Sequence, residues 1–249
     1  MPSIIADNIS LHYPVMASVR TNMSSRASTG QVIKYRSSHY IEAISGATFS
    51  IKAGERVGIV GRNGSGKSTL LRVLGGIYEP TAGAIQVDGH VSSLFNINLG
   101  TQPEATGRHN ILIRGLLKGM SRKEIYSKVD EIVEFSELGD FIDMPLRTYS
   151  QGMAMRLSFA VATTFSPEII LLDEWIGAGD MNFQWKAAKR MNELVAQAGI
   201  TVIASHNRNL LKNICDTAIW LDGGVLKAHA PIDEVYELMD QHDAERAAS

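Results

Sequence analysis

The sequence of 249 residues has one cysteine, no long apolar run and almost no net charge, and each absence excludes a class of protein. Cys215 alone cannot form an internal disulfide framework, which favours a reducing compartment such as the cytosol. No stretch approaches the roughly 20 apolar residues of a membrane-spanning helix, and residues 1–10 lack the basic start and apolar run of a secretory signal. The formal net charge of −2 gives no indication of a nucleic-acid partner. We therefore expect a globular protein that serves a membrane, if at all, through a partner.

The order of the apolar segments predicts a fold of the α/β class. Short apolar strands at residues 56–60, 169–172 and 201–204 alternate with helical patterns, which is typical of a mostly parallel sheet. Strand-like segments at residues 4–13 and 47–51 predict an N-terminal antiparallel β portion. Two further short strands, around residues 84–87 and 91–94, are expected to be joined by a turn at Asp88-Gly89.

A helical block interrupts this alternation between about residues 105 and 165. Ser121 and Glu124 have the spacing of a capping box. Behind them, apolar residues recur at helical spacing and define one buried face: Ile125, Val129, Ile132 and Val133. We therefore divide the chain into an α/β core over residues 1–95 and 166–249 and a helical subdomain over residues 96–165.

The segment Pro14–Tyr40 has an unusual composition. It is rich in Ser, Thr and Arg and contains no acidic residue, and we expect most of it to be an irregular insertion. A solvated basic loop is one interpretation, and a surface that faces lipid head groups or a membrane partner is the other.

A glycine-rich loop at residues 61–69 carries the clearest chemical pattern. Its sequence, GRNGSGKST, matches G-x-x-x-x-G-K-[ST] and lies between an apolar strand and a predicted helix. Glycines let the backbone N–H groups point at phosphate oxygens, and the helix start adds positive potential. The residues predicted to bind nucleotide here are Gly61, Arg62, Asn63, Gly64, Ser65, Gly66, Lys67, Ser68 and Thr69. Lys67 is expected to contact the β- and γ-phosphates during catalysis and Ser68 to bind Mg²⁺, which predicts a P-loop NTPase (RecA-like) fold.

Residues 169–174, IILLDE, form an apolar strand that ends in two acids. Parallel strands present such carboxylates at the nucleotide edge of the sheet. Asp173 can then hold Mg²⁺ and Glu174 can act as the general base for water. Two acids can also mark the exit of a strand into solvent, but the phosphate loop favours the catalytic interpretation.

Three further elements, in order along the chain, resemble those of the ABC ATPases. Residues 149–153, YSQGM, resemble the family's signature sequence LSGGQ and begin a predicted helix, with Ser150 as its N-cap. Asp180, in the sequence GAGD, matches the aspartate of the family's dimer-contact loop. His206 matches the switch histidine that contacts the γ-phosphate. The resemblance implies that ATP and Mg²⁺ bind between two copies of the chain. The residues that would complete the other copy's site are Ser150, Gln151, Gly152 and Met153.

Two positions of the family pattern stay open. Asn96 and Gln102 both fall in the segment that should supply a Mg²⁺-sensing glutamine. Tyr13 matches the aromatic residue that stacks on adenine, although Tyr35 or Tyr40 could take that place after the long insertion.

Four elements resemble the ATPase subunits of bacterial polysaccharide and O-antigen exporters: TGRHN at residues 106–110, TYSQGM at residues 148–153, GAGD at residues 177–180 and Cys215-Asp216. That resemblance covers about residues 4–239. It implies a peripheral protein at the cytoplasmic face of the inner membrane that works with a polytopic permease to export a lipid-linked glycan such as O-antigen, capsule or teichoic acid. The alternatives are an ATPase subunit for drugs, lipids or nutrients, and a soluble non-transport ABC ATPase.

Overall fold

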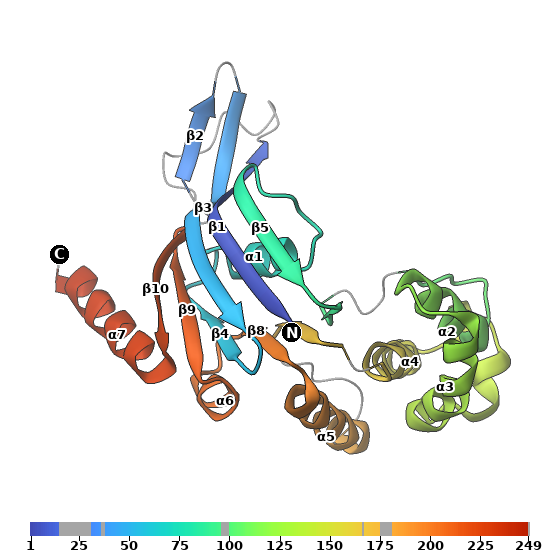
Figure 1. Ribbon diagram of the computed structural model, residues 1–249. Helices are drawn as coiled ribbons and strands as arrows, with labels where there is room; N and C mark the ends of the chain where they lie inside the picture. The colour runs from blue at the N-terminus through green and yellow to red at the C-terminus, as the bar shows by residue number, and fades with distance from the viewer. Residues whose placement is uncertain (15–30, 36–37, 96–99, 166, 175–180, 249) are drawn as a thin grey trace. The chain divides into compact units, whose positions relative to one another are not determined.

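The computed structural model describes residues 1–14, 31–35, 38–95, 100–165, 167–174 and 181–248 (Figure 1). The chain forms two compact units. The first comprises Met1–Ser92, Glu168–Trp175 and Gly199–Ser249, and the second comprises Ser93–Pro167 and Ile176–Ala198.

The sheet follows the strand order β5-β1-β3-β10-β9-β4-β8-β7-β6, with β2 paired to β3. Its strands are β1 (Ser3–Pro14), β2 (Gln31–Tyr35), β3 (Ser38–Lys52), β4 (Arg56–Val60), β5 (Ala82–Asp88), β6 (Val91–Ser93), β7 (Ile169–Asp173), β8 (Ile200–Ala204), β9 (Thr217–Asp222) and β10 (Val225–Pro231). Strands β9, β4, β8 and β7 are mutually parallel neighbours, whereas β1 is antiparallel to β3 and β5. The predicted α/β fold with an N-terminal antiparallel portion is thus confirmed.

The central strands end at one edge of the sheet, and this alignment positions the site. Ala204, the last residue of β8, pairs with Ile59 of β4 and with Asp173 of β7. All three strands are buried apolar runs, as expected for parallel strands covered on both faces. The residues that follow β4, β7 and β8 therefore emerge side by side.

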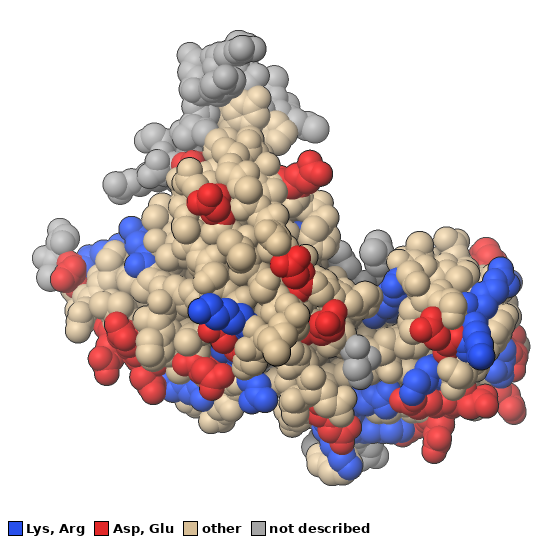
Figure 2. All heavy atoms as spheres, viewed as in Figure 1, with Lys and Arg blue, Asp and Glu red and all other residues tan. Residues whose placement is uncertain are grey.

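Among the residues that the structure describes, the first unit has three helices (Figure 1): α1 (Lys67–Leu74), α6 (Arg208–Ile214) and α7 (Ile232–Ala248). Helix α1 buries Leu70, Leu71 and Leu74, and the N–H of its C-cap, Gly75, donates to Leu71 O. On the face that Figure 2 shows, basic and acidic side chains are interspersed, in agreement with the small net charge.

Part of the segment predicted to be irregular is a strand. Strand β2 pairs antiparallel with β3, from Gln31 opposite Glu42 to Tyr35 opposite Ser38. The expectation of a mostly irregular insertion is therefore wrong for residues 31–35 and 38–40, while residues 15–30 and 36–37 lie outside the described part. The sequence QVIKY contains β-branched and aromatic residues, and this local preference outweighs the polar composition around it.

The two strands around Asp88-Gly89 do not pair with each other. Strand β5 pairs with β1, and β6 lies beside β7 at the other end of the strand order. Gly89 does adopt a positive φ of 119°. The sequence Asp88-Gly89 thus predicts the local backbone conformation correctly. The pairing of the two strands is instead decided by their neighbours in the sheet, β1 and β7.

The second unit is helical. It contains α2 (Gly107–Leu117), α3 (Arg122–Ser136), α4 (Gln151–Thr163) and α5 (Met181–Gln197), with short 3₁₀ helices at Gly139–Asp143 and Leu146–Thr148. The capping box at the start of α3 is confirmed, since Ser121 Oγ accepts from Glu124 N and the Glu124 carboxylate accepts from Ser121 N. Phe135, Phe159 and Phe183 pack together with ring centroids 5.7–6.1 Å apart and join α3, α4 and α5.

Two cations, Arg114 of α2 and Lys118 at its C-cap, reach the backbone of α4 inside this unit. Arg114, 6% exposed, donates from Nη2 to Ser158 O at 3.2 Å. One turn later, Lys118 Nζ donates to Ala162 O at 3.3 Å. These contacts give the second half of α4 partners for its carbonyl groups, which point toward the negative end of the helix dipole.

Within the described ranges, none of the helices combines the length and the apolar composition that crossing a membrane requires.

Candidate active site

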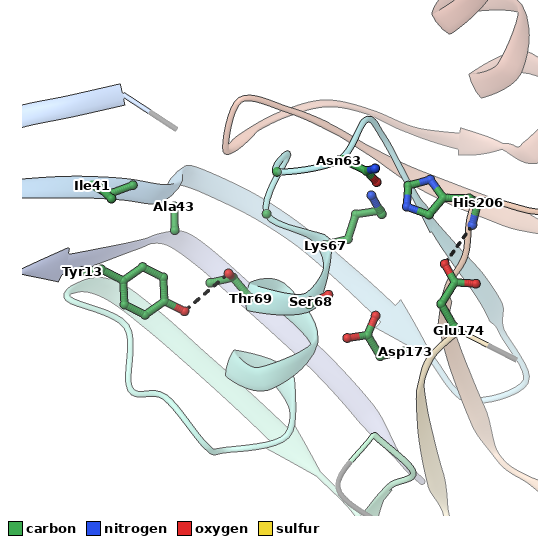
Figure 3. Close-up of a pocket in the computed structure, with 12 residues that line it drawn as sticks. Tyr13, Ile41, Ala43, Asn63, Lys67, Ser68, Thr69, Asp173, Glu174 and His206 are labelled. Carbon is green, nitrogen blue, oxygen red and sulfur yellow. Dashed lines mark hydrogen bonds between the residues drawn. The ribbon is translucent and has the colours of Figure 1, made fainter. Parts of the chain in front are cut away.

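A cavity of about 490 Å³ in the first unit brings together most of the predicted site (Figure 3). It is lined by Tyr13, Ile41, Ala43, Asn63, Gly64, Gly66, Lys67, Ser68, Thr69, Asp173, Glu174 and His206. Figure 3 shows Tyr13, Ile41 and Ala43 toward one side and Lys67, Asp173, Glu174 and His206 toward the other. The cavity thus has an aromatic and apolar end and a charged end, which suits a ligand with a base and phosphates.

The loop between β4 and α1 requires glycine at two positions. Gly61 has a φ of 146°, and a Cβ there would overlap Leu221 O. Gly66 has a φ of 104°, and a Cβ there would lie 2.6 Å from Ala43 O. Both glycines let the loop pass close to neighbouring backbone and place α1 directly after it. The start of α1 consequently faces the cavity, where its free N–H groups can receive an anion.

Lys67 carries the positive charge of this loop. It is 7% exposed, and its Nζ donates to Gly61 O at 2.9 Å and to Arg62 O at 3.0 Å. Burial lowers the pKa of the Lys67 ammonium, and the negative charges of Glu174 and Asp173 partly oppose that decrease. The ammonium is held at the cavity by neutral carbonyls, so a phosphate oxygen can take up one of its donors.

The same loop contains a buried hydroxyl that suits a phosphate ligand. Ser65 is 3% exposed, and its Oγ has no hydrogen-bond partner among the described residues. Buried polar groups in native proteins nearly always have a hydrogen-bond partner. The unpaired hydroxyl of Ser65 is therefore consistent with a loop whose missing partner is a polar ligand such as a phosphate.

Ser68 and Asp173 provide the oxygen atoms that Mg²⁺ prefers. Both line the cavity, one at the second residue of α1 and the other at the last residue of β7. Over the described ranges no cluster of three or more His, Cys, Asp or Glu side chains could hold a metal. One hydroxyl and one carboxylate nevertheless fit Mg²⁺, which usually binds through one or two protein carboxylates, waters and substrate phosphates.

Glu174 is held by residues that follow β8. Its N–H donates to Ala204 O at 2.8 Å, and its φ of 67° is unusual for a residue other than glycine. Ser205 Oγ donates to Glu174 Oε2 at 2.9 Å, and His206 N donates to Oε1 at 3.2 Å. Both oxygens of the Glu174 carboxylate therefore accept a hydrogen bond, and the carboxylate lies beside the candidate switch histidine, His206. Sequence reasoning missed Ser205, although its place directly before His206 at a strand end was a signal.

Tyr13 is the candidate aromatic residue that lines the cavity. Its hydroxyl lies 3.4 Å from Thr69 Oγ1, and its ring meets that of Tyr78 edge to face at 5.7 Å. Of the alternatives, Tyr40 does not line the cavity, and the side chain of Tyr35 lies outside the described part. Ile41 and Ala43 are lining residues that sequence reasoning missed.

The second unit carries the predicted signature residues at the start of α4. Ser150 is the N-cap, and its Oγ accepts from Met153 N at 3.2 Å. Gln151 and Gly152 are exposed in the first turn. The predicted cap is therefore present, and the free N–H groups of this helix start face solvent in the single chain.

Gln102 lies in the segment before α2, where Asn110 anchors the backbone. Asn110 is buried, its Oδ1 accepts from Gln102 N at 2.7 Å, and its Nδ2 donates to Gln102 O at 2.9 Å. The side chain of Gln102 is exposed. Asn96 and Asp180 lie outside the described residues, so their predicted roles stay predictions.

Comparison with known proteins places the chain in a family. A family model described as "ABC transporter" matches residues 44–177. The O-antigen export system ATP-binding protein RfbE of Yersinia enterocolitica is 44% identical over 232 residues, which cover 91% of this chain and 97% of that protein. RfbB of Myxococcus xanthus, with the same description, is 45% identical over 200 residues that cover 80% of this chain but only 46% of that protein. The teichoic acids export ATP-binding protein TagH of Lactococcus lactis is 40% identical over 78% of this chain and 41% of its own length.

Solved structures agree with the fold. The dimeric, post-hydrolysis structure of the ATP-binding cassette MJ0796 with ADP and Pi has a TM-score of 0.66 at 22% identity, covering 92% of this chain and 98% of that one. An ATP-binding subunit of an ABC transporter has a TM-score of 0.70 at 20% identity, covering 95% and 93%. The predicted resemblance is confirmed: with a family model over more than half of its residues and a 44%-identical relative covered almost end to end, the chain belongs to the ABC transporter family.

Proposed function

We propose that the chain is the ATP-hydrolysing subunit of an ABC exporter that moves a lipid-linked polysaccharide, such as O-antigen, across the inner membrane. The observation that carries the ATPase assignment is the cavity in which Lys67, Asp173, Glu174 and His206 meet. The export assignment is supported by relatives that are named for O-antigen and teichoic acid export. The named relatives give no support for a drug or nutrient transporter or for a soluble non-transport ATPase.

In this proposal, different residues at the cavity bind the base, bind the phosphates, hold Mg²⁺ and activate water. The loop N–H groups and Lys67 bind the phosphates, and Tyr13 with Ile41 and Ala43 receives the base. Mg²⁺, bound by Ser68 and Asp173, supplies charge neutralisation for the phosphates. Glu174 accepts a proton from the attacking water at its carboxylate. His206 lies beside Glu174 and contacts the terminal phosphate.

A second copy of the chain completes the site in this proposal. The exposed N-terminus of α4, with Ser150, Gln151, Gly152 and Met153, offers N–H groups and a positive dipole end to a phosphate. The MJ0796 cassette, which shares the fold, is described as dimeric. Two copies around two ATP molecules would therefore close when ATP binds and separate after hydrolysis. Asp180 would lie at the contact between the copies.

The membrane is reached through a partner. We place the chain peripherally at the cytoplasmic face of the inner membrane, bound to a polytopic permease that carries the lipid-linked glycan. Of the two candidates for the Mg²⁺-sensing residue, Gln102 is exposed and Asn96 lies outside the described residues. Whichever of the two senses Mg²⁺ would link the nucleotide to that partner.

The ATPase assignment is tested with a Glu174→Gln variant of the purified chain. Phosphate release from Mg-ATP should fall by roughly 100-fold or more, as expected for removal of a general base, while ATP still binds because the loop is intact. Glu79→Gln is the matched control, since Glu79 is an exposed carboxylate of the same unit, and it should keep wild-type activity. A Glu174→Gln chain that turns over ATP at the wild-type rate would contradict the assignment of the base.

The export assignment is tested by affinity purification from detergent-solubilised membranes of the host. Tagged Glu174→Gln protein with Mg-ATP should recover one polytopic membrane protein in equal amount, identified by mass spectrometry. Disruption of the gene should remove the surface glycan and leave its lipid-linked form inside the cell. Recovery of ribosomes or DNA-repair proteins instead would remove transport from the proposal.

A further inference from the structure

We propose that Ser205 is a positioning residue for Glu174, whose hydroxyl fixes the direction in which the carboxylate meets the attacking water. This role rests on the proposed ATPase function, because it acts on the general base of that reaction. Ser205 does not line the cavity and reaches the chemistry only through Glu174.

The first observation is the direction of the hydrogen bonds at the Ser205 hydroxyl. Ser205 is 3% exposed and directly follows β8. Its Oγ accepts from Asn207 N at 3.2 Å and lies 2.9 Å from Glu174 Oε2. A hydroxyl has one proton and two acceptor positions. Because Asn207 N occupies an acceptor position, the proton is available to Glu174.

The second observation is the rigidity of the base that supports this hydroxyl. Asn207 is the N-cap of α6, and its Oδ1 accepts from Leu210 N at 3.0 Å. Asp173 and Ala204 pair across β7 and β8, and Glu174 N extends this ladder by donating to Ala204 O. Ser205 and the backbone of Glu174 are therefore fixed to neighbouring strand ends, and the hydroxyl meets the carboxylate at a defined place.

The third observation is the strained backbone at Glu174. A φ of 67° is disfavoured for a residue with a Cβ, and such outliers persist where the surroundings enforce them. The left-handed conformation turns the side chain of Glu174 back toward Ser205 and His206. Figure 3 shows the carboxylate of Glu174 directed at the backbone of His206.

Without the hydroxyl, the exposed Glu174 side chain would keep one hydrogen bond of 3.2 Å, from His206 N. A carboxylate side chain has several rotatable bonds and would sample orientations away from the cavity. The alternative role for Ser205 is structural, as a cap for the turn through Asn207 N. That role predicts lost stability in a variant, whereas positioning predicts lost turnover that depends on Glu174.

The test compares steady-state and single-turnover ATP hydrolysis for Ser205→Ala, Ser205→Thr, Glu174→Gln and the double variant. Ser205→Ala should lower kcat by about 10-fold or more, as for loss of a hydrogen bond to a charged group, with KM for ATP unchanged within about twofold. Ser205→Thr keeps the hydroxyl and should recover most of kcat. In the Glu174→Gln background, Ser205→Ala should change the residual rate by less than about twofold, because the group that it positions is absent.

Thr201→Val is the matched control, because it removes a buried hydroxyl from β8, the strand that Ser205 directly follows. Thr201 is 1% exposed, and its hydroxyl has no partner among the described residues, so kcat should not change. The positioning role would be overturned if Ser205→Ala kept the wild-type kcat. It would also be overturned if Ser205→Ala lowered kcat by the same factor in the wild-type and the Glu174→Gln backgrounds. Either result would leave the proposed ATPase function intact. A wild-type chain without ATPase activity would overturn the proposed function and the role of Ser205 together.

Discussion

Replacing Lys118 with methionine should remove a pH dependence from the stability of the helical unit. Lys118 is partly buried at the C-cap of α2, one turn after Arg114, and its Nζ donates to Ala162 O at 3.3 Å. Burial lowers the pKa of the Lys118 ammonium from 10.5 to about 8, and the positive charge of Arg114 adds to that decrease. The folded chain therefore holds the proton of Lys118 less tightly than the unfolded chain does.

The sign and the size of the change in the free energy of unfolding with pH follow from that difference in proton binding. Between pH 8 and 10.5 the unfolded chain binds a proton that the folded chain does not, so the free energy of unfolding rises with pH in this window. Below pH 8 the folded chain carries the enclosed charge, and the destabilisation is complete. The gap between 10.5 and about 8 corresponds to at most about 3 kcal/mol. Most of this should be regained between pH 7 and pH 10.

The assay is urea unfolding of wild type and Lys118→Met at pH 7, 8, 9 and 10. The variant should lack the rise with pH. Burial raises the pKa of the Cys215 thiol to about 12, which weakens stability above pH 9, but this effect is common to both proteins and cancels in their difference. Lys123→Met, at an exposed position on α3, is the matched control and should show the wild-type pH dependence. A difference between wild type and Lys118→Met that is equal at pH 7 and pH 10 would refute the reasoning.

Two further outcomes concern the nucleotide site and the signature helix. Gly66→Ala should abolish ATP binding, measured by calorimetry, because its Cβ would lie 2.6 Å from Ala43 O at a φ of 104°. A Cβ added at Gly76 would meet nothing within 4 Å and would only strain the backbone at its φ of 68°. Gly76→Ala should therefore lose about 1 kcal/mol of stability and bind ATP normally, and weak binding by both variants would contradict the steric argument. Ser150→Ala should lose about 1 kcal/mol in urea unfolding, because the cap to Met153 N is removed. It should also slow ATP hydrolysis without weakening ATP binding to the single chain, and unchanged hydrolysis would speak against completion of the site in trans.

The parts of the molecule that sequence predicts best are those set by local chemistry. The loop at residues 61–69 is recognised from its glycines, its lysine and the helix that follows, although the close approaches of Gly61 to Leu221 O and of Gly66 to Ala43 O are long-range. The capping box of Ser121 and Glu124 and the cap at Ser150 are local, and the structure has both. Each is decided by hydrogen bonds within a few residues, which a sequence displays directly.

The parts that sequence could not supply depend on distant partners. Strand β6 pairs beside β7 rather than with β5, because sheet neighbours are chosen by long-range packing. Arg114 and Lys118 look like solvated charges on a helix, yet both reach carbonyl groups of α4. Ser205 gains its importance from Glu174, 31 residues earlier in the chain. The residues adjacent in sequence do not predict any of these long-range contacts.

The left-handed backbone at Glu174 lowers the folding stability of the chain at a position whose side chain is needed for the proposed ATP hydrolysis. Glycine adopts such a φ without strain and asparagine with little, whereas glutamate loses about 1 kcal/mol or more. If Glu174 is the general base, as proposed, replacing it with Gly or Asn would relieve this strain and stabilise the chain, but would slow hydrolysis of the bound nucleotide. Residue 174 is thus a position at which an unstrained backbone and the proposed chemistry require different amino acids.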